Sequence, residues 1–526
     1  MKGFGDLYKI EKKKNKKTKF SKKELINQAI QLHSKGNIKE AKNYYEQIIN
    51  QGWNDERVFF NYGIILQGIG KLKEAEFSYR KAIELNPDYL NAHLNLGNIL
   101  RDLDKLEDAE ISTRKAIELD PYYSEAHSNL GVILRDLDKL EDAEISIRKA
   151  IELNKNNARA HSNLGNILLD FGNLKEAELC QRKAIELDPD LAIAYYLLSG
   201  IKYSYDNNIW RDQIFSKIFI KNKSPEDQVY IYFSRANISH KEKKYKDSSR
   251  FLQLANNLKL SLYPSDIDTL RNKSRRLLVE SEKKEIYIKD NKSSPESIFI
   301  VGMPRCGSTL LESILSMSND VYDLGETNFL EEAFLECKKS EQNINFSNFY
   351  HEKVKNKTKL NITTNKNLYN YQYVGFIARE IPNAKIIHCF RHPLDNILSI
   401  YKAHFSKGNR YSSSLVDCAK IYLDQEEIMC AYKNRFRSKI YDLNYDSLVI
   451  NPNQEIRDLI SWLGWKWQDS FLSPELNTRS VSTASNVEVR SPINTKSIGG
   501  WKNYKEMLKP AIEILTQNDK YQDINL

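Results

Sequence analysis

The fold of the C-terminal part is decided by the stretch Ile298-Phe299-Ile300-Val301-Gly302-Met303-Pro304-Arg305-Cys306-Gly307-Ser308-Thr309. Four apolar residues before a loop with two glycines predict a buried strand, a phosphate-binding loop and the start of a helix. The spacing is that of a Walker A loop, but Ser308 occupies the lysine position and Arg305 is the nearest cation. The pattern therefore favours a phosphate bound without a metal ion, because helix-start N–H groups and an arginine fork both suit an anion.

A second strand, predicted at residues 385–390, is followed directly by Arg391, and an apolar pattern at helical spacing continues through Phe405. Because the carboxyl ends of parallel strands meet at one edge of a sheet, we expect Arg391 to reach a phosphate bound near Arg305. The C-terminal part is therefore predicted to be an α/β domain with a central parallel sheet.

The N-terminal part repeats every 34 residues, which is the period of tetratricopeptide repeats. Each unit is predicted to be two antiparallel helices that cross closely at small residues. About five repeats are expected, because Ala29, Gly36 and Ala41 fit the register one unit before the clearest copies. The signature glycines are Gly63, Gly97, Gly131 and Gly165.

The predicted organisation has four segments. Residues 1–20 are a basic flexible tail, since lysines cluster there with few apolar residues. Residues 21–190 are an all-α tetratricopeptide solenoid, and residues 191–290 keep a helical pattern that would extend and cap it. Residues 291–526 are the α/β domain.

An asparagine recurs two residues before each signature glycine, although asparagine is a mediocre helix former. Its carboxamide donates and accepts, so a ladder of such side chains can bind an extended polypeptide on the concave repeat surface. The ladder resembles the one in the repeats of the O-linked N-acetylglucosamine transferase, where it holds polypeptides. The alternative is repeat consensus that hydrogen-bonds between adjacent helices. The residues are Asn61, Asn95, Asn129 and Asn163.

The two arginine-tipped strands and the repeats resemble a bacterial sulfotransferase in which a domain of the protein-tyrosine sulfotransferase type is fused to tetratricopeptide repeats. The resemblance extends over residues 296–510. It implies a P-loop-like sulfotransferase domain that uses 3′-phosphoadenosine 5′-phosphosulfate, releases adenosine 3′,5′-bisphosphate and needs no metal. The acceptor would be a hydroxyl group, most simply that of a polypeptide tyrosine held by the repeats.

The resemblance also implies roles for single residues. Glu326, 21 residues after Arg305, corresponds to the catalytic glutamate, and Lys366, 25 residues before Arg391, corresponds to the catalytic lysine. Ser485 corresponds to a catalytic serine near the leaving group that also contacts the cofactor. The implied cofactor-binding residues are Arg305, Cys306, Gly307, Ser308, Thr309, Arg391, Ser399, Tyr445 and Ser485.

Three positions depart from the family pattern. Gly500 stands where relatives have a lysine or arginine on the cofactor, Asn365 replaces an aspartate, and Asn328 replaces an arginine that follows the catalytic glutamate. The absence of this arginine affects mainly which acceptor the enzyme would use. Sulfation of a carbohydrate or lipid hydroxyl therefore stays open, as does a repeat scaffold with a weakened enzyme domain. The cations that would replace the one missing at Gly500 are Lys496, Lys502 or Arg490.

The composition also bears on whether the protein spans a membrane, binds nucleic acid or binds a metal. No apolar stretch approaches the roughly 20 residues that span a bilayer, and no signal-peptide core is present, so a cytoplasmic protein is expected. The net charge of +9 comes with no nucleic-acid-binding motif, and no nucleic-acid partner is predicted. Six cysteines lack metal spacing, so no metal site is predicted. The oligomeric state is left open.

Overall fold

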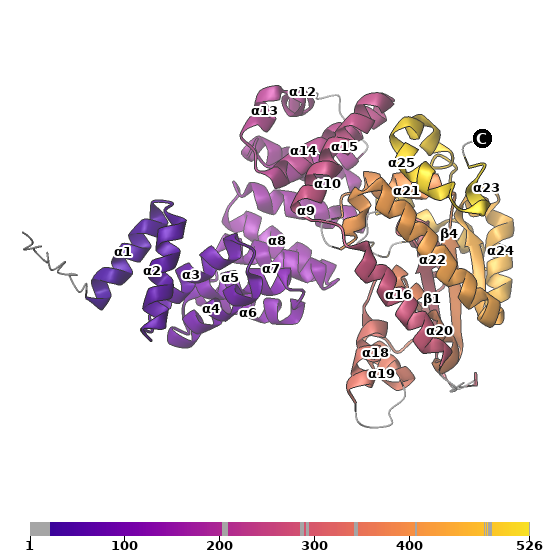
Figure 1. The fold of residues 1–526 in the computed structure, drawn as a ribbon, viewed down its shortest axis with the longest axis horizontal. Helices are drawn as coiled ribbons and strands as arrows, with labels where there is room; N and C mark the ends of the chain where they lie inside the picture. Colours follow the sequence, from indigo (N-terminus) through magenta and orange to yellow (C-terminus); the bar gives the residue numbers. More distant parts are fainter. Residues whose placement is uncertain are drawn as a thin grey trace, which may run out of the picture. The chain divides into compact units, whose positions relative to one another are not determined.

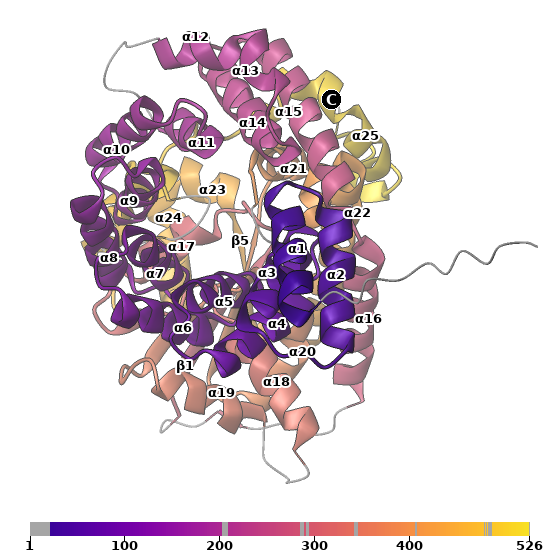
Figure 2. The ribbon, with the colours of Figure 1, turned by 90° about the vertical axis from the view of Figure 1, so that its left-hand side faces the viewer.

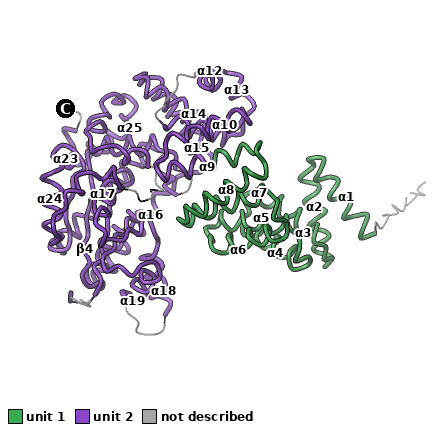
Figure 3. The backbone as a smooth tube through the Cα atoms, turned by 180° about the vertical axis from the view of Figure 1, so that it is seen from behind, with its two compact units in different colours: residues 1–163 green, residues 164–526 purple. Residues whose placement is uncertain are grey.

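The computed structural model describes residues 21–201, 209–283, 289–290, 294–340, 346–405, 408–477, 479, 481 and 486–524. Figure 1 shows the order of its helices and strands. The chain separates into two units, residues 1–163 and residues 164–526 (Figure 3). The predicted basic tail at residues 1–20 lies outside the described residues.

The first unit consists of paired helices that follow one another in sequence order (Figure 2). This confirms the predicted all-helical repeat region. Helix α9, Ala158–Phe171, spans the boundary at residue 163. The preceding helices are α1 Lys22–Ser34, α2 Ile38–Asn50, α3 Glu56–Gly68, α4 Leu72–Leu85, α5 Leu90–Asp102, α6 Leu106–Leu119, α7 Ser124–Asp136 and α8 Leu140–Leu153.

The signature glycines lie where the two helices of a repeat cross. A Cβ atom added at any of them would lie 2.2–2.7 Å from a side chain of the second helix, far inside van der Waals contact. Only glycine therefore allows this crossing distance. The glycine and its contact residue are Gly63 with Tyr79, Gly97 with Thr113, Gly131 with Ile147, and Gly165 with Gln181.

The second unit begins with helices that precede the α/β domain in the sequence. The hairpin of α14 and α15 carries Phe233 and Phe251, which pack in one core with Leu394 and Tyr401 of α21. The N-terminal helices of this unit are α10 Leu174–Leu187, α11 Ala192–Gly200, α12 Ile209–Phe215, α13 Lys217–Lys221, α14 Pro225–Lys241, α15 Tyr245–Leu262 and α16 Ile267–Glu282.

A five-stranded sheet forms the centre of the α/β domain, with the order β2-β3-β1-β4-β5. All neighbouring strands are parallel, which confirms the predicted parallel sheet. The strands are β1 Glu296–Gly302, β2 Val321–Asp323, β3 Ile362–Asn365, β4 Ala384–Phe390 and β5 Ile440–Asn444. The helices are α17 Ser308–Leu315, α18 Phe329–Lys339, α19 Phe346–Lys355, α20 Val374–Glu380, α21 Pro393–Lys402, α22 Leu415–Phe436, α23 Tyr445–Ile450, α24 Pro452–Leu463 and α25 Lys505–Leu515.

Strand β1 is apolar from Ile298 onward because both faces of the sheet are covered there. Phe299 and Val301 pack in a core with residues of α18, α19, α20 and α22. Ile298 and Ile300 point to the opposite face and pack with residues of α17 and α24. The alternation of side chains along a strand thus supplies both cores from one short run.

None of the helices within the described residues is both long enough and apolar enough to cross a membrane.

The crossing at Gly131 can be tested by substitution. Gly131→Ala would place a Cβ atom 2.5 Å from Ile147 Cγ1 and 3.0 Å from the Ala143 carbonyl oxygen. Overpacking of this kind lowers the free energy of unfolding by about 1–3 kcal/mol, against a gain of up to about 1 kcal/mol in helix propensity. Gly68→Ala is the matched control, because its Cβ atom would meet no atom of the described residues within 4 Å.

Urea unfolding followed by circular dichroism should therefore show Gly131→Ala to be less stable than Gly68→Ala. Equal stability of the two variants would contradict the tight helix crossing.

Candidate active site

The loop between β1 and α17 ends at Gly307, which has φ 96° and precedes the first residue of α17. A Cβ atom at Gly307 would lie 2.1 Å from Cδ2 of Tyr445, so the aromatic ring sits directly on the loop backbone. The next two residues, Ser308 and Thr309, begin the helix and are buried. Their N–H groups belong to the first turn of the helix, which is the usual anion-binding element of such loops.

Arg305 lies in the same loop with φ 65°, a left-handed conformation that is uncommon for residues other than glycine. Its Nε donates a hydrogen bond to Ser399 Oγ on α21 at 3.1 Å. Its Nη2 donates to the Glu488 carboxylate at 2.6 Å. Two residues predicted to bind the cofactor therefore meet, and the arginine fork already holds an anionic group.

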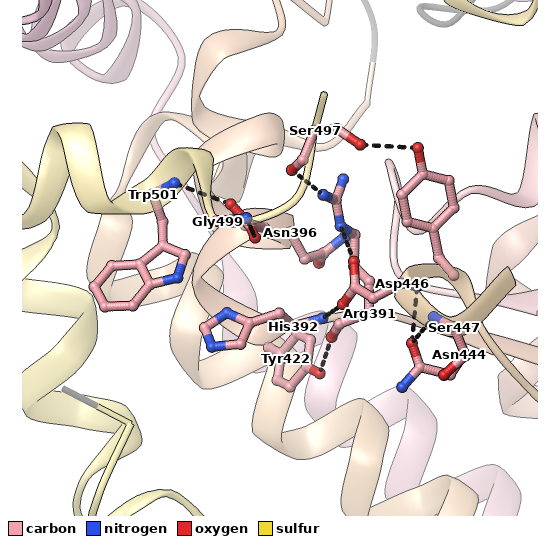
Figure 4. A network of polar contacts seen from close by, with 12 residues as sticks. Arg391, His392, Asn396, Tyr422, Asn444, Asp446, Ser447, Ser497, Gly499 and Trp501 are labelled. Carbon is pink, nitrogen blue, oxygen red and sulfur yellow. Dashed lines mark hydrogen bonds and ion pairs between the residues drawn. The ribbon is translucent and has the colours of Figure 1, made fainter. Parts of the chain in front are cut away.

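Arg391, at the end of β4, is buried beside a tyrosine and an aspartate (Figure 4). Its Nη2 donates to the Ser497 carbonyl oxygen at 2.7 Å, and its guanidinium carbon lies 4.7 Å from the centroid of the Tyr445 ring. Within the part of the chain that the structure describes, its Nε is buried without a hydrogen-bond partner and lies 4.0 Å from Asp446 Oδ1. A buried donor without an acceptor is costly, so this arginine is suited to an additional anionic ligand.

Two aspartates hold the backbone around Arg391: one binds the segment around Gly500, and Asp446 binds the residue that follows Arg391 (Figure 4). Asp395 accepts hydrogen bonds from the Gly499 and Trp501 backbone N–H groups at 2.7 and 2.9 Å. Asp446 accepts from the His392 N–H at 2.7 Å. The segment around Gly500 is thereby anchored through its backbone, independently of a cationic side chain at that position.

Lys366 connects two carboxylates at the end of β3. Its Nζ lies 2.9 Å from Glu326 Oε1 and 3.7 Å from Glu312 Oε2. The lysine side chain is fully buried, whereas that of Glu326 is 58% exposed. Burial opposes the charged form of Lys366, but the two carboxylates outweigh it and raise the pKa of the ammonium group. The structure thus joins the two residues predicted to be catalytic and adds Glu312, which the sequence analysis missed.

Lys402 is a second group that the sequence analysis missed. It ends α21 three residues after Ser399, so it lies on the same side of that helix. Burial, with a contribution from the charge of Arg305, lowers the pKa of its ammonium group to about 8. The helical spacing from Ser399 was visible in the sequence, but the burial of Lys402 was not.

The candidate substitutes for the cation missing at Gly500 differ in their surroundings. Lys496 and Lys502 are exposed. Arg490 instead binds backbone carbonyl groups: its Nη2 donates to Arg479 at 2.6 Å and to Asp170 at 3.2 Å, and its Nη1 donates to Asn477. Arg490 therefore has a structural role in this arrangement.

The other predicted site residues divide into three groups. Cys306 is buried in the loop beneath the sheet edge, among the apolar residues of α17 and β4. Ser485 lies outside the described residues.

In the asparagine ladder, Asn61 Nδ2 donates to the Arg57 carbonyl oxygen at 2.8 Å, and Asn163 Nδ2 donates to Ser128 Oγ of the preceding repeat at 3.3 Å. The first contact lies within α3, whereas the second joins two helices and matches the helix-to-helix role for Asn163. Peptide binding by the ladder stays a prediction.

Comparison with known proteins divides the chain into the same two kinds of region. Residues 295–469 match the sulfotransferase family. Residues 25–153 match the middle TPR-like domain of cilia and flagella-associated protein 70, and residues 158–191 match a tetratricopeptide repeat.

Two relatives align with part of the chain. An uncharacterized protein of Aquifex aeolicus is 30% identical over 263 residues, which are 44% of this chain and 35% of that protein. Protein-tyrosine sulfotransferase 1 of Danio rerio is 23% identical over 237 residues, which are 40% of this chain and 66% of that protein. The chain thus spans about a third of the first relative and just under two thirds of the second.

Among solved structures, a tetratricopeptide repeat protein from Parabacteroides merdae is 20% identical, covers 45% of this chain and 93% of its own, and has a TM-score of 0.36. MamA is 22% identical, covers 31% of this chain and 96% of its own, and has a TM-score of 0.29. The family matches and the second relative show that the chain combines a sulfotransferase-family domain and TPR-like domains in one polypeptide and is weakly related to protein-tyrosine sulfotransferase.

Proposed function

We propose that the chain transfers the sulfuryl group of 3′-phosphoadenosine 5′-phosphosulfate to a tyrosine hydroxyl of a polypeptide acceptor. The observation that carries this proposal is the pair of arginines that follow two adjacent strands. Among the described residues, the buried Arg391 Nε has no hydrogen-bond acceptor, and Asp446 Oδ1 lies 4.0 Å away. A donor with two separate phosphate groups requires two such anion sites. The same proposal includes the division of the chain into a repeat solenoid up to about residue 190, a helical extension up to about residue 290, and the α/β domain after it.

The two phosphate groups are assigned to different residues. Arg305 and the N–H groups of residues 306–309 would hold the 5′-phosphate, as the loop before a helix favours. Arg391 and Ser399 would hold the 3′-phosphate, and Tyr445, which touches both Gly307 and Arg391, would contact the nucleotide between them. Glu488 would leave the Arg305 fork, since one planar fork binds one anion in bidentate geometry.

Lys402 supplies a cation where Gly500 has none. It lies one helical turn after Ser399, and the charge of Arg305 acts on it. Its ammonium group is partly withdrawn from solvent, so it is a costly charge that a bound phosphate would compensate. We propose that Lys402 is the cation that binds the cofactor in place of the one missing at Gly500. Lys496 and Lys502 are exposed, and Arg490 binds carbonyl groups.

The proposed chemistry is a direct displacement at sulfur. The acceptor oxygen forms a bond to sulfur, the bond from sulfur to the phosphate oxygen breaks, and the phenol proton goes to Glu326. A tyrosine has a pKa of about 10 and a glutamate of about 4.3, so Glu326 takes the proton during attack and not before it. Lys366, Ser485 and the loop N–H groups would stabilise the charge that develops on the departing phosphate oxygen.

A carbohydrate or lipid hydroxyl is the second candidate acceptor. It is favoured by the contacts of Asn61 and Asn163, whose amide groups already donate hydrogen bonds within the solenoid. The proposed base and phosphate sites would serve either acceptor.

The donor site is tested by binding of adenosine 3′,5′-bisphosphate in the presence of EDTA. Arg305→Ala and Arg391→Ala should each weaken binding by at least about 1.4 kcal/mol, or tenfold, because each removes a charge-assisted contact. Arg437→Ala is the control, since Arg437 is exposed and pairs with Asp442. Isothermal titration calorimetry measures the affinities of the wild type and the three variants. Equal binding of ATP, or a requirement for magnesium, would refute the proposed donor site.

The base is tested by Glu326→Gln, which keeps the shape of the side chain but cannot accept the proton. Turnover should fall about 100-fold or more while the affinity for adenosine 3′,5′-bisphosphate stays near wild type. Glu331→Gln is the matched control, because Glu331 pairs with Lys273 outside the site. Full turnover by Glu326→Gln under single-turnover conditions would exclude Glu326 as the base.

The ladder is tested by replacing all four asparagines with alanine. The apparent KM for a polypeptide acceptor should rise, while the rate with free tyrosine stays constant as a control for the enzyme domain. Each lost amide contact contributes only about 0.5–1.5 kcal/mol, so the four residues must be replaced together. If both acceptors respond alike, or neither responds, the ladder is repeat consensus and the second candidate acceptor is favoured. The four are Asn61, Asn95, Asn129 and Asn163.

A further inference from the structure

Glu312 is a buried carboxylic acid beside the proposed catalytic pair that the proposed reaction does not yet use. It lies on α17, one helical turn after Ser308. Its Oε1 accepts a hydrogen bond from Thr364 Oγ1 at 3.2 Å, and its Oε2 lies 3.7 Å from Lys366 Nζ. Its side chain is 10% exposed, so it is closed to a polypeptide acceptor but remains in contact with the lysine.

The arrangement places one ammonium group between two carboxylates of different exposure. Lys366 is fully buried, and a buried charge without a partner is strongly disfavoured. Glu326 Oε1 is its closer partner at 2.9 Å. Asp323 is the other acidic group that acts on Glu312, and it pairs with Arg479 Nη1 at 3.0 Å.

The contact between Lys366 and Glu326 conflicts with the proposed role of Glu326. A carboxylate that is paired with an ammonium group is a weaker base, because the pairing favours its ionised form. Glu326 must therefore lose this partner as it takes the acceptor proton. Lys366 must then retain a counter-charge, and among the described residues Glu312 is the carboxylate within 4 Å that can provide it.

We propose that Glu312 is a positioning residue for the proposed transfer: its carboxylate keeps Lys366 charged and holds it away from Glu326 while Glu326 accepts the proton. This inference rests on the proposed function. It involves no covalent step, since Lys366 only moves from one carboxylate toward the other and toward the leaving oxygen.

The ionisation of Glu312 gives the proposal a measurable pH dependence. Burial raises the pKa of the Glu312 carboxyl to about 7, while Lys366 acts in the opposite direction. Below that pH Glu312 becomes neutral, so Lys366 is drawn to Glu326 and blocks the base. The turnover of the wild-type protein should therefore fall as the pH decreases through about 7.

The test compares pH–kcat profiles for the full chain with 3′-phosphoadenosine 5′-phosphosulfate and a tyrosine acceptor. Glu312→Gln should lower kcat by roughly tenfold to a hundredfold, leave the donor KM nearly unchanged, and remove the fall near pH 7. Glu312→Asp should retain that fall. Thr364→Val should move it to higher pH, because the Thr364 hydroxyl stabilises the ionised form.

Glu380→Gln is the matched control, because Glu380 is also buried but lies on α20, whereas the carboxylates that act on Lys366 are Glu326 and Glu312. Its pH profile should coincide with that of the wild type. A Glu312→Gln profile with an unchanged fall near pH 7 would overturn the proposal, and so would an equal change in Glu380→Gln.

A second measurement separates this inference from the proposed function. Glu312 titrates near 4.5 in an unfolded chain and near 7 in the folded one. The folded wild type therefore binds more protons between these pH values, and its free energy of unfolding should fall as the pH rises through that window. Glu312→Gln should lack this loss. The same pH dependence in both proteins would overturn the assignment of Glu312, whereas absence of wild-type transfer with a normal stability difference would overturn the proposed function alone.

Discussion

The parallel pairing of β1 with β4 is the constraint on which the rest of the proposed site depends. Gly302 pairs with Cys389 at the last register position, so both strands end at the same edge of the sheet. The helices that follow them, α17 and α21, consequently begin side by side, and Asn396 Nδ2 donates to the Pro304 carbonyl oxygen at 2.9 Å. This places an arginine from each connection at one edge, where the positive ends of two helices add to the same potential.

The fold and part of the candidate site were predictable because their signals are local. A buried strand before a glycine loop and a period of 34 residues each reflect packing that recurs within a short stretch. Glu312 lies four residues after Ser308, and Lys402 lies three after Ser399, so helical geometry indicated which side they share. Their burial was not predictable, since it depends on β3 and on the helices of residues 225–262.

Contacts between distant segments could not be read from the sequence. Arg305 and Glu488 form a hydrogen bond although they are 183 residues apart in the sequence, and no local sequence pattern predicts this contact. Arg490 is one of the cations that the sequence offers for phosphate binding, but it donates hydrogen bonds to three carbonyl groups from two segments. One of them is Asp170 of α9, which also accepts from the Val481 N–H at 3.0 Å and from Asn486 Nδ2 at 2.8 Å. The end of this helix therefore supports the segment that carries Glu488.

The most direct measurement is a structure of the full chain with adenosine 3′,5′-bisphosphate, grown without magnesium. The account predicts the 3′-phosphate on Arg391 Nε and Ser399 and the 5′-phosphate on the N–H groups of residues 306–309. Glu488 should no longer contact Arg305. A nucleotide bound away from the β1–β4 edge, or one that leaves the Arg391 Nε without an acceptor, would contradict the central claim.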